Sequence, residues 1–376
     1  MSPATSPRPV AAMRLLVVDG STGTLGVADA RTFPELLAPG DLVVVNDAAT
    51  LPASFAARTA AGEPVELRLA GRAAEGSEPR FVAALLGAGD YRTRTEVRPL
   101  PPLIASGARL FVGDELVAHV TGHSSISERL VELHFSVAEG SEADVWAAIY
   151  RAGRPVQYAH VPEPLALWDV QNVYAFEPWA VEMPSAGRLF RAETFGALKA
   201  RGIAIARVTH AAGLSSTGDP KIDEALPLPE RWRVPEETVR LVEATHARGG
   251  RVLAVGTSVV RALESASAGT TLTAGEGITH LKLGPGARRT VVDGVVTGVH
   301  EADTTHYALL GAFASAKVLE NALVLAEHED LLGHEFGDAC LVWGSPVAAA
   351  TRKALDRPAP VSRREVTQEG RGWSLA

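Results

Sequence analysis

The sequence predicts a mixed α/β fold of two domains, an α/β layered main domain with an antiparallel β-barrel domain inserted into it. Three observations support this prediction. Residues 41–136 contain short runs of strand-forming residues, separated by turn signals and without a clear helix. After Ser141, helical and strand patterns alternate, as in α/β layered domains. Two early strand patterns, at residues 14–19 and 42–45, would join that later body.

The strand-rich segment is the basis of the predicted barrel. Strand patterns occupy residues 65–69, 81–86 and 130–135, and the last alternates between apolar and polar residues. Gly113 and Asp114 separate two further strand patterns and suit a two-residue hairpin turn. Because short strands without helices favour a small barrel or sandwich, we place an inserted β-barrel domain at residues 56–149.

A helix start marks the return to the main domain. Ser141 is a capping residue, Glu142 and Asp144 complement the positive end of a helix, and Gly153 suits its end. Further helices, expected at residues 192–201, 235–248 and 259–268, alternate with strands expected at 203–209, 252–255 and 278–283. We therefore assign residues 1–55 and 150–350 to a discontinuous main domain, and 351–376 to a basic, flexible tail.

The charge of the chain limits its partners. It has 36 Lys and Arg against 44 Asp and Glu, a formal net charge of −8, so no overall field attracts nucleic acid or an anionic membrane. RNA contact would need a local patch; residues 351–376 are one candidate, although such tails are more often simply solvated. A single cysteine, no signal-peptide pattern and no membrane-length apolar helix predict a cytoplasmic protein. The oligomeric state is left open.

A strand that leads directly into a helix is the sharpest chemical signal. An apolar strand is followed by Gly256, Thr257 and Ser258, and the helix begins there. Backbone N–H groups at such a helix start form a site for a carboxylate or phosphate. Alternatively, Thr257 or Ser258 merely caps the helix. Arg261 and Glu264, three residues apart, would share a helix face and could pair with each other at the surface.

A second segment brings a histidine to the end of a strand. Residues 291–300 predict a hairpin with its turn at Asp293 and with His300 at its end. Histidine in such a place can exchange protons near neutral pH, although a lone histidine is more often structural. The nearby Glu301 and His306 do not complete a zinc-binding spacing, so we expect no metal.

Six segments in one order resemble the S-adenosylmethionine:tRNA ribosyltransferase-isomerase family of queuosine biosynthesis. Val255-Gly-Thr-Ser-Val-Val-Arg-Ala-Leu-Glu264 is similar to the family's Val-Gly-Thr-Thr-Ser-Val-Arg-Ala-Leu-Glu, and Phe336-Gly-Asp-Ala339 to its Tyr-Gly-Asp-Ala. The resemblance extends from Asp41 to Val342. The other four similar segments are residues 41–47, 170–175, 183–190 and 291–300.

This resemblance implies an α/β domain with an inserted β-barrel, and an enzyme. Family members transfer and isomerise the ribosyl part of S-adenosylmethionine onto the aminomethyl group of a deazaguanine base in tRNA, forming epoxyqueuosine and releasing adenine and methionine. S-adenosylmethionine is thus a substrate and tRNA a partner, with no metal. Such chemistry needs a base for a ribose 5′ proton that the sulfonium acidifies, and a group that holds the methionine carboxylate.

The resemblance also implies the site residues. Catalysis is expected of His210, His300 and Glu264. Substrate binding is expected of Gly256, Thr257, Ser258, Arg261, Asn46, Asp47, Glu230 and Asp338.

Several polar positions of the family pattern differ here. Ala49 replaces an arginine, and Leu189 and Leu228 replace histidines. Two alternatives therefore stay open. One is a family paralogue that uses S-adenosylmethionine or another adenosyl compound on a small molecule, and the other is a non-catalytic relative.

Overall fold

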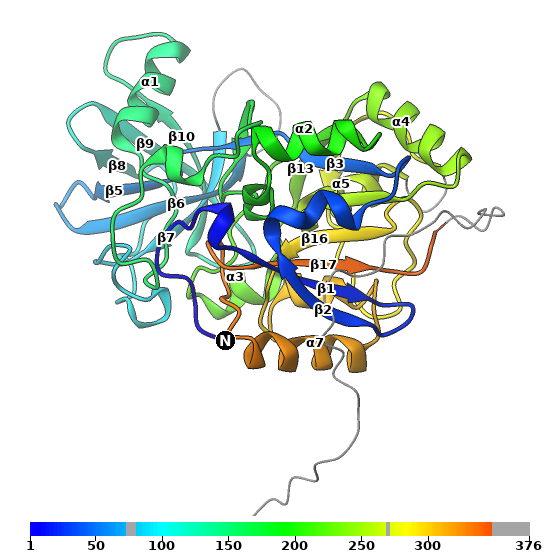
Figure 1. The fold of residues 1–376 in the computed structure, drawn as a ribbon. Helices are drawn as coiled ribbons and strands as arrows, with labels where there is room; N and C mark the ends of the chain where they lie inside the picture. The colour runs from blue at the N-terminus through cyan, green and yellow to red at the C-terminus, as the bar shows by residue number, and fades with distance from the viewer. Residues whose placement is uncertain (73–79, 268–270, 348–376) are drawn as a thin grey trace, which may run out of the picture.

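A nine-stranded sheet forms the centre of the computed structural model, which describes residues 1–72, 80–267 and 271–347 (Figure 1). Strands β12, β3, β14 and β16 run parallel to one another, and β17 returns antiparallel to β16. The order across the sheet is β15 (Gly275–Thr279), β13 (Glu230–Val234), β12 (Ala204–His210), β3 (Leu42–Asn46), β14 (Val252–Val255), β16 (Gly294–Gly298), β17 (Ala339–Trp343), β1 (Arg14–Asp19) and β2 (Leu25–Asp29).

The central strands are apolar throughout because helices cover both faces of the sheet. In β3, Leu42 and Val44 pack in one core with α4 (Glu236–Ala247), α5 (Thr257–Ser267) and α7 (Ala316–His328). Val43 and Val45 face the opposite core, which includes α2 (Ala192–Ala200) and the 3₁₀ helix η2 (Ala30–Leu36). The alternation of side chains along a strand thus produces a three-layered body.

A closed antiparallel barrel forms the second body and lies to the left in Figure 1. Phe55, Phe81 and Phe135 are in its core, and α1 (Glu142–Ala152) packs against that core through Val145 and Ile149. The barrel order is β10 (Leu130–Ser136), β7 (Arg80–Leu86), β6 (Pro64–Arg72), β5 (Ser54–Arg58), β8 (Arg109–Val112) and β9 (Leu116–His123). The expected fold class, with a barrel inserted into an α/β body, is confirmed.

Short elements complete the structure. Strand β4 (Ala48–Thr50) pairs in parallel with β11 (Glu177–Ala180) beside the main sheet. The others are α3 (Pro220–Ala225), α6 (Thr305–Leu310), η1 (Val10–Ala12), η3 (Thr95–Val97), η4 (Leu167–Val170) and η5 (Ser185–Leu189). The domain limits expected at 55/56 and 149/150 stay a prediction, and the expected basic tail lies outside the described residues.

The hairpin predicted for residues 291–300 is wrong. The backbone N–H groups of Val291 and Val292 donate to the carboxylate of Glu264, at 3.0 and 2.9 Å, instead of pairing with a strand. The Asp293 carboxylate accepts the backbone N–H of Val252 at 2.9 Å. Strand β16 therefore pairs with β14 and β17, two strands far away in the sequence.

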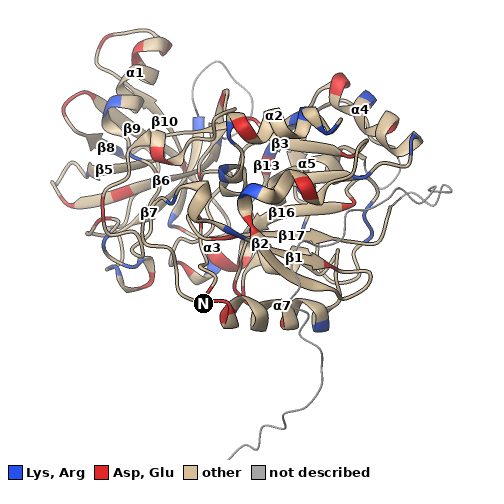
Figure 2. Cartoon of the chain, in the orientation of Figure 1, with Lys and Arg blue, Asp and Glu red and all other residues tan. Residues whose placement is uncertain are grey.

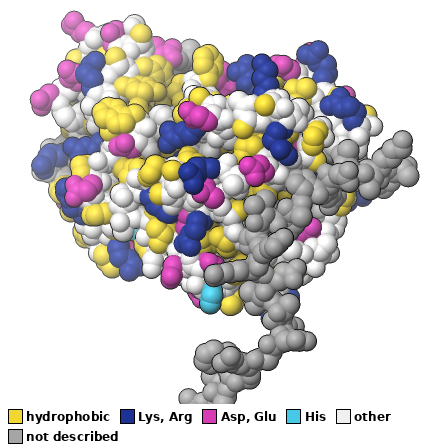
Figure 3. Space-filling model, viewed as in Figure 1, with side chains coloured by type: hydrophobic (Ala, Val, Ile, Leu, Met, Phe, Trp, Pro, Cys, Tyr) yellow, Lys and Arg dark blue, Asp and Glu magenta, His cyan; other side chains and the backbone are white. Residues whose placement is uncertain are grey.

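The visible surface carries both signs of charge. Figure 2 shows basic and acidic residues interspersed along the ribbon, and Figure 3 shows their side chains on the visible face without a large region of one sign. Within the described part of the chain, no helix has the length and apolar character needed to cross a membrane.

Candidate functional site

A pocket lies where the carboxyl ends of the parallel strands meet. Ligands commonly bind at this edge of an α/β sheet. His210 is the last residue of β12, Gly256 follows β14 directly, and His300 lies two residues after β16. These three residues and Glu230, at the start of β13, line a cavity of about 230 Å³. The sheet topology thus gathers residues that are distant in the sequence.

The start of α5 forms one wall of the pocket. Gly256 adopts a φ of 96°, which residues with a Cβ rarely take, and its N–H donates to Val296 O at 2.7 Å. The helix begins immediately afterwards, so its first N–H groups have no intrahelical acceptor. Thr257 and Ser258 line the cavity, and so does Arg261 one turn later on the same helix face. This wall combines a helix N-terminus with a cation, which suits an anionic ligand group.

Three buried charged or titratable side chains meet beside this wall. Nε2 of His210 lies 3.3 Å from Oε2 of Glu230, and Nη1 of Arg261 pairs with the same oxygen. The backbone N–H of Gly213 donates to Glu230 Oε1 at 2.7 Å, and Nε of Arg261 donates to Leu281 O at 3.0 Å. Across residues 1–72, 80–267 and 271–347, His210 Nε2 contacts only Glu230, and neither Nδ1 of His210 nor Nη2 of Arg261 has a hydrogen-bond partner. These atoms remain for a ligand.

Burial determines the protonation of this cluster. It lowers the pKa of His210 well below its usual value, and the positive charge of Arg261 lowers it further. Burial also lowers the pKa of Arg261 to about 10, so the guanidinium stays charged at neutral pH. The site thus pairs a neutral imidazole, which can accept a proton, with a permanent cation.

Two further histidines line the same pocket. Nε2 of His300 lies 2.6 Å from Thr297 Oγ1, and its ring stacks on His306 with centroids 4.8 Å apart. Burial lowers the pKa of His300 well below its usual value, with smaller effects from His306 and His334. Burial likewise lowers the pKa of His306, and Arg261 adds to the effect. Both imidazoles are therefore neutral at pH 7.

One pocket carboxylate was missed from the sequence. Glu182 lines the cavity, and its two oxygens accept the Ser215 N–H at 3.0 Å and hydroxyl at 2.8 Å. The Tyr158 hydroxyl also donates to it. Burial raises the pKa of Glu182 despite these hydrogen bonds. Glu182 directly precedes the similar segment that begins at Met183, and only the fold brings Tyr158 beside it.

Asn46 and Asp47 lie behind the pocket and do not line it. Oδ1 of Asn46 accepts the backbone N–H of His210 at 2.9 Å, and its Nδ2 donates to His210 O at 3.0 Å and to Ser258 Oγ at 3.3 Å. Asp47 accepts the Thr209 hydroxyl at 2.6 Å, and burial raises the pKa of its carboxyl. In this structure both residues form hydrogen bonds to their neighbours, and the substrate contact expected of them stays a prediction.

Glu264 and Asp338 do not line this pocket either, and the roles expected of them in catalysis and binding stay predictions. Glu264 accepts the three backbone N–H groups of residues 290–292 at 2.8–3.0 Å, and Arg261 pairs with Glu230 in place of the possible surface pair with Glu264. Asp338 accepts the backbone N–H of Arg14 at 2.7 Å and is 1% exposed. The hydrogen-bonding capacity of both carboxylates is used to fix the backbone.

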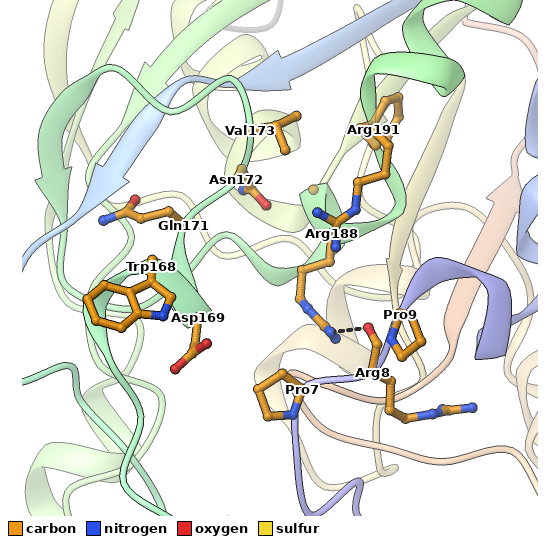
Figure 4. Close-up of a pocket in the computed structure, with 12 residues that line it drawn as sticks. Pro7, Arg8, Pro9, Trp168, Asp169, Gln171, Asn172, Val173, Arg188 and Arg191 are labelled. Carbon is orange, nitrogen blue, oxygen red and sulfur yellow. Dashed lines mark hydrogen bonds between the residues drawn. The ribbon is translucent and has the colours of Figure 1, made fainter.

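A second hollow, of about 250 Å³, shares no lining residue with the first (Figure 4). Nη2 of Arg188 donates to the backbone oxygen of Arg8 at 2.7 Å, and burial lowers the pKa of Arg188 to about 10. Trp168 and Arg191 stand at its rim, and Trp168 is 79% exposed. An exposed indole near guanidinium groups offers a flat surface to a stacked base.

Comparisons with known proteins agree on one family. The model of the family described as "Queuosine biosynthesis protein" matches residues 2–342. The S-adenosylmethionine:tRNA ribosyltransferase-isomerase of Acidithiobacillus ferrooxidans is 34% identical, over 88% of this chain and 91% of its own. The protein of that name from Thiobacillus denitrificans is 33% identical, over 87% and 90%. A solved S-adenosylmethionine tRNA ribosyltransferase from Thermotoga maritima is 25% identical, with a TM-score of 0.48 over 90% of this chain and 95% of that one.

Proposed function

The chain belongs to the queuosine biosynthesis protein family, and from this premise we propose that it transfers and isomerises the ribosyl part of S-adenosylmethionine onto a deazaguanine base of tRNA. Its relatives are named as transferase-isomerase enzymes. The observation that carries the proposal is the buried group of His210, Glu230 and Arg261 in the pocket beside α5. It supplies a proton acceptor and an anion-binding group within one cavity.

The proposed donor site uses the start of α5. The methionine carboxylate of S-adenosylmethionine would lie against the N–H groups of Thr257 and Ser258. Nη2 of Arg261, for which the described residues provide no acceptor, would give it a charge-assisted hydrogen bond. Holding this end of the substrate fixes the position of the sulfonium and the ribose.

The proposed base is His210. The sulfonium acidifies the ribose 5′ protons, and a neutral buried imidazole can take one at pH 7. The imidazolium that forms would be stabilised by Glu230, 3.3 Å away. His300 is the alternative base, because it is also neutral and lines the same cavity. The raised pKa of Glu182 suits a carboxyl group that protonates the departing adenine.

The proposed acceptor is tRNA, in the cytoplasm. Because charges of both signs are interspersed on the visible surface, RNA binding must depend on local features. The second hollow is such a feature, and Trp168 at its rim would stack on an unpaired base with Arg191 near the backbone.

Buried leucines favour a second candidate function, in which the same donor reacts with a small molecule. Leu189 and Leu228, at two histidine positions of the family pattern, are only 1% and 7% exposed. They pack in the sheet core and the barrel core respectively. Two polar contacts that the family reaction would use are thus replaced by apolar packing.

Adenine release tests the proposal. The protein is incubated with S-adenosylmethionine and tRNA that carries the aminomethyl-deazaguanine base, and adenine and the mass of the tRNA base are measured. We expect one adenine for each ribosylated base, and none with tRNA that carries guanine. Adenine release without tRNA modification would favour the small-molecule reaction. No release under either condition would contradict the proposed function.

A further inference from the structure

A group of three potential metal ligands lies next to the pocket, outside the residues assigned above. The side chains of His160, His334 and Glu335 each offer one ligand atom, and these atoms all lie within 4.8 Å of one another. Nε2 of His160 is 3.0 Å from Oε2 of Glu335, and the two histidine rings have centroids 4.3 Å apart. The ligands come from two loops that are far apart in the sequence.

The loop that carries His160 is fixed from within. Gln157 is 4% exposed, and its amide nitrogen Nε2 donates to Val161 O at 2.7 Å and to Glu163 O at 2.6 Å. Its Oε1 accepts the backbone N–H of Leu165 at 2.9 Å. One buried amide side chain thus holds the turn on which His160 lies.

The loop that carries His334 and Glu335 is fixed in the same way. Asp338 accepts the backbone N–H of Leu332 at 2.8 Å, and its own N–H donates to Leu332 O at 2.8 Å. His334 has a φ of 65°, and its carbonyl accepts the N–H of Gly337 at 3.0 Å. A Cβ at Gly337 would clash with Leu332 O. A positive φ is unfavourable for a residue other than glycine, so the surrounding contacts must hold this loop in its conformation.

We propose that His160, His334 and Glu335 bind one zinc ion, which links the two loops. Two imidazoles and one carboxylate form a ligand set that zinc accepts, with a fourth position for water. Tetrahedral zinc brings its ligand atoms to about 3.4 Å from one another, so separations of up to 4.8 Å must shorten by about 1.4 Å at most. His334 is exposed and can supply this movement by rotating its side chain.

The zinc site would adjoin the pocket through a short chain of contacts. The Tyr158 ring lies parallel to that of His160, with centroids 6.4 Å apart, and its hydroxyl donates to Glu182. Glu182 lines the pocket, so the linked loops would support one of its walls. No sequence spacing indicates this site, because its ligands lie at residue 160 and at residues 334–335.

Zinc titration tests the inference directly. The intact protein, dialysed against a chelator and then against buffer, is titrated with zinc chloride by calorimetry. We expect one equivalent to bind, and the thermal midpoint to rise with zinc. His160→Ala, His334→Ala and Glu335→Gln should each weaken the binding at least tenfold and reduce the zinc-dependent rise. His328→Ala removes an exposed histidine elsewhere and should leave both unchanged.

Two outcomes would overturn the inference. The first is that the wild-type protein binds no zinc. The second is that it binds zinc with the same affinity as His160→Ala and His334→Ala. Circular dichroism of each variant shows whether it is folded, and His334→Ala is informative even if His160→Ala is not, because His334 is exposed.

Discussion

The two halves of α5 each carry one buried charged side chain, and the two side chains differ in how fully they are hydrogen-bonded. In the half that lines the pocket, Arg261 pairs with Glu230 and has a further nitrogen without a partner among the residues the structure describes. In the other half, Glu264 accepts three backbone N–H groups and one hydroxyl from residues 290–292. Both residues belong to one short similar segment, and both are buried. Arg261 nevertheless keeps a nitrogen without a partner among the described residues, whereas Glu264 is hydrogen-bonded to the backbone.

This difference separates a binding role from a structural one. A buried polar group is normally satisfied, so an unsatisfied one needs an explanation such as a ligand. Arg261 and His210 have unsatisfied atoms facing a cavity, whereas Glu264 supports the backbone that leads into β16. We therefore expect substitutions in the first group to affect the reaction, and substitutions of Glu264 to affect folding.

The largest expected effect is on turnover. His210→Gln removes the proposed base while it keeps a polar side chain, so the rate of adenine release should fall about 10²- to 10⁴-fold. Single-turnover kinetics with saturating S-adenosylmethionine measure this effect. His328→Gln, at an exposed position, is the matched control. A His210→Gln protein with wild-type turnover would assign the base role elsewhere, with His300 as the next candidate.

The next effect is on stability. Glu264→Ala leaves three buried backbone N–H groups without an acceptor, so the free energy of unfolding should fall by about 3 kcal/mol or more. Denaturant unfolding measures this change, and Glu320→Ala, on the exposed face of α7, should change it little. If Glu264→Ala kept its stability but lost S-adenosylmethionine binding, the division of α5 into two halves would be wrong.

The free energy of unfolding should depend on pH through His210. Burial holds the folded-state pKa of His210 well below 6.5, whereas the unfolded chain takes up a proton near 6.5. The corresponding stability is fully present above pH 6.5 and is lost as the pH falls toward the folded-state pKa, by up to about 1.4 kcal/mol per pH unit. His210→Gln should therefore flatten the decline in unfolding free energy between pH 6.5 and 5. An unchanged slope would show that this histidine is not held neutral.

The smallest effect concerns the helix start. Ser258→Ala removes one hydroxyl from the pocket wall but keeps the backbone N–H groups, so the affinity for S-adenosylmethionine should fall only about 2- to 10-fold. Equilibrium binding measures it. Ser265→Ala, farther along α5, removes a hydroxyl that pairs with Thr279 and should not change the affinity. Equal losses in both variants would argue against a specific contact at Ser258.

The fold was predictable where patterns are local. The apolar run of β14, the helix start at Gly256 and the alternation in β10 each depend on neighbouring residues, and all three elements formed as expected. The turn at Asp293 was mispredicted because the acceptor for residues 291–292 is Glu264, which lies on a different element. A contact of that kind has no periodicity for the sequence to reveal.

The candidate site was predictable in part for a similar reason. The resemblance named Arg261 and Glu264 together, because both lie in one similar segment, residues 255–264. It could not indicate which groups surround each side chain, so the catalytic role expected of Glu264 stays a prediction. Glu182 was missed because its partner Tyr158 is brought to it only by the fold.

Calorimetric titration with S-adenosylmethionine tests the central claim most directly, that the pocket beside the first half of α5 is the donor site. We predict saturable one-to-one binding to the wild-type protein, and affinity at least tenfold weaker for Arg261→Gln. Arg151→Gln, which removes an exposed guanidinium near the barrel, should bind like the wild type. Equal affinity of Arg261→Gln and the wild type, or no binding to the wild type, would contradict the account.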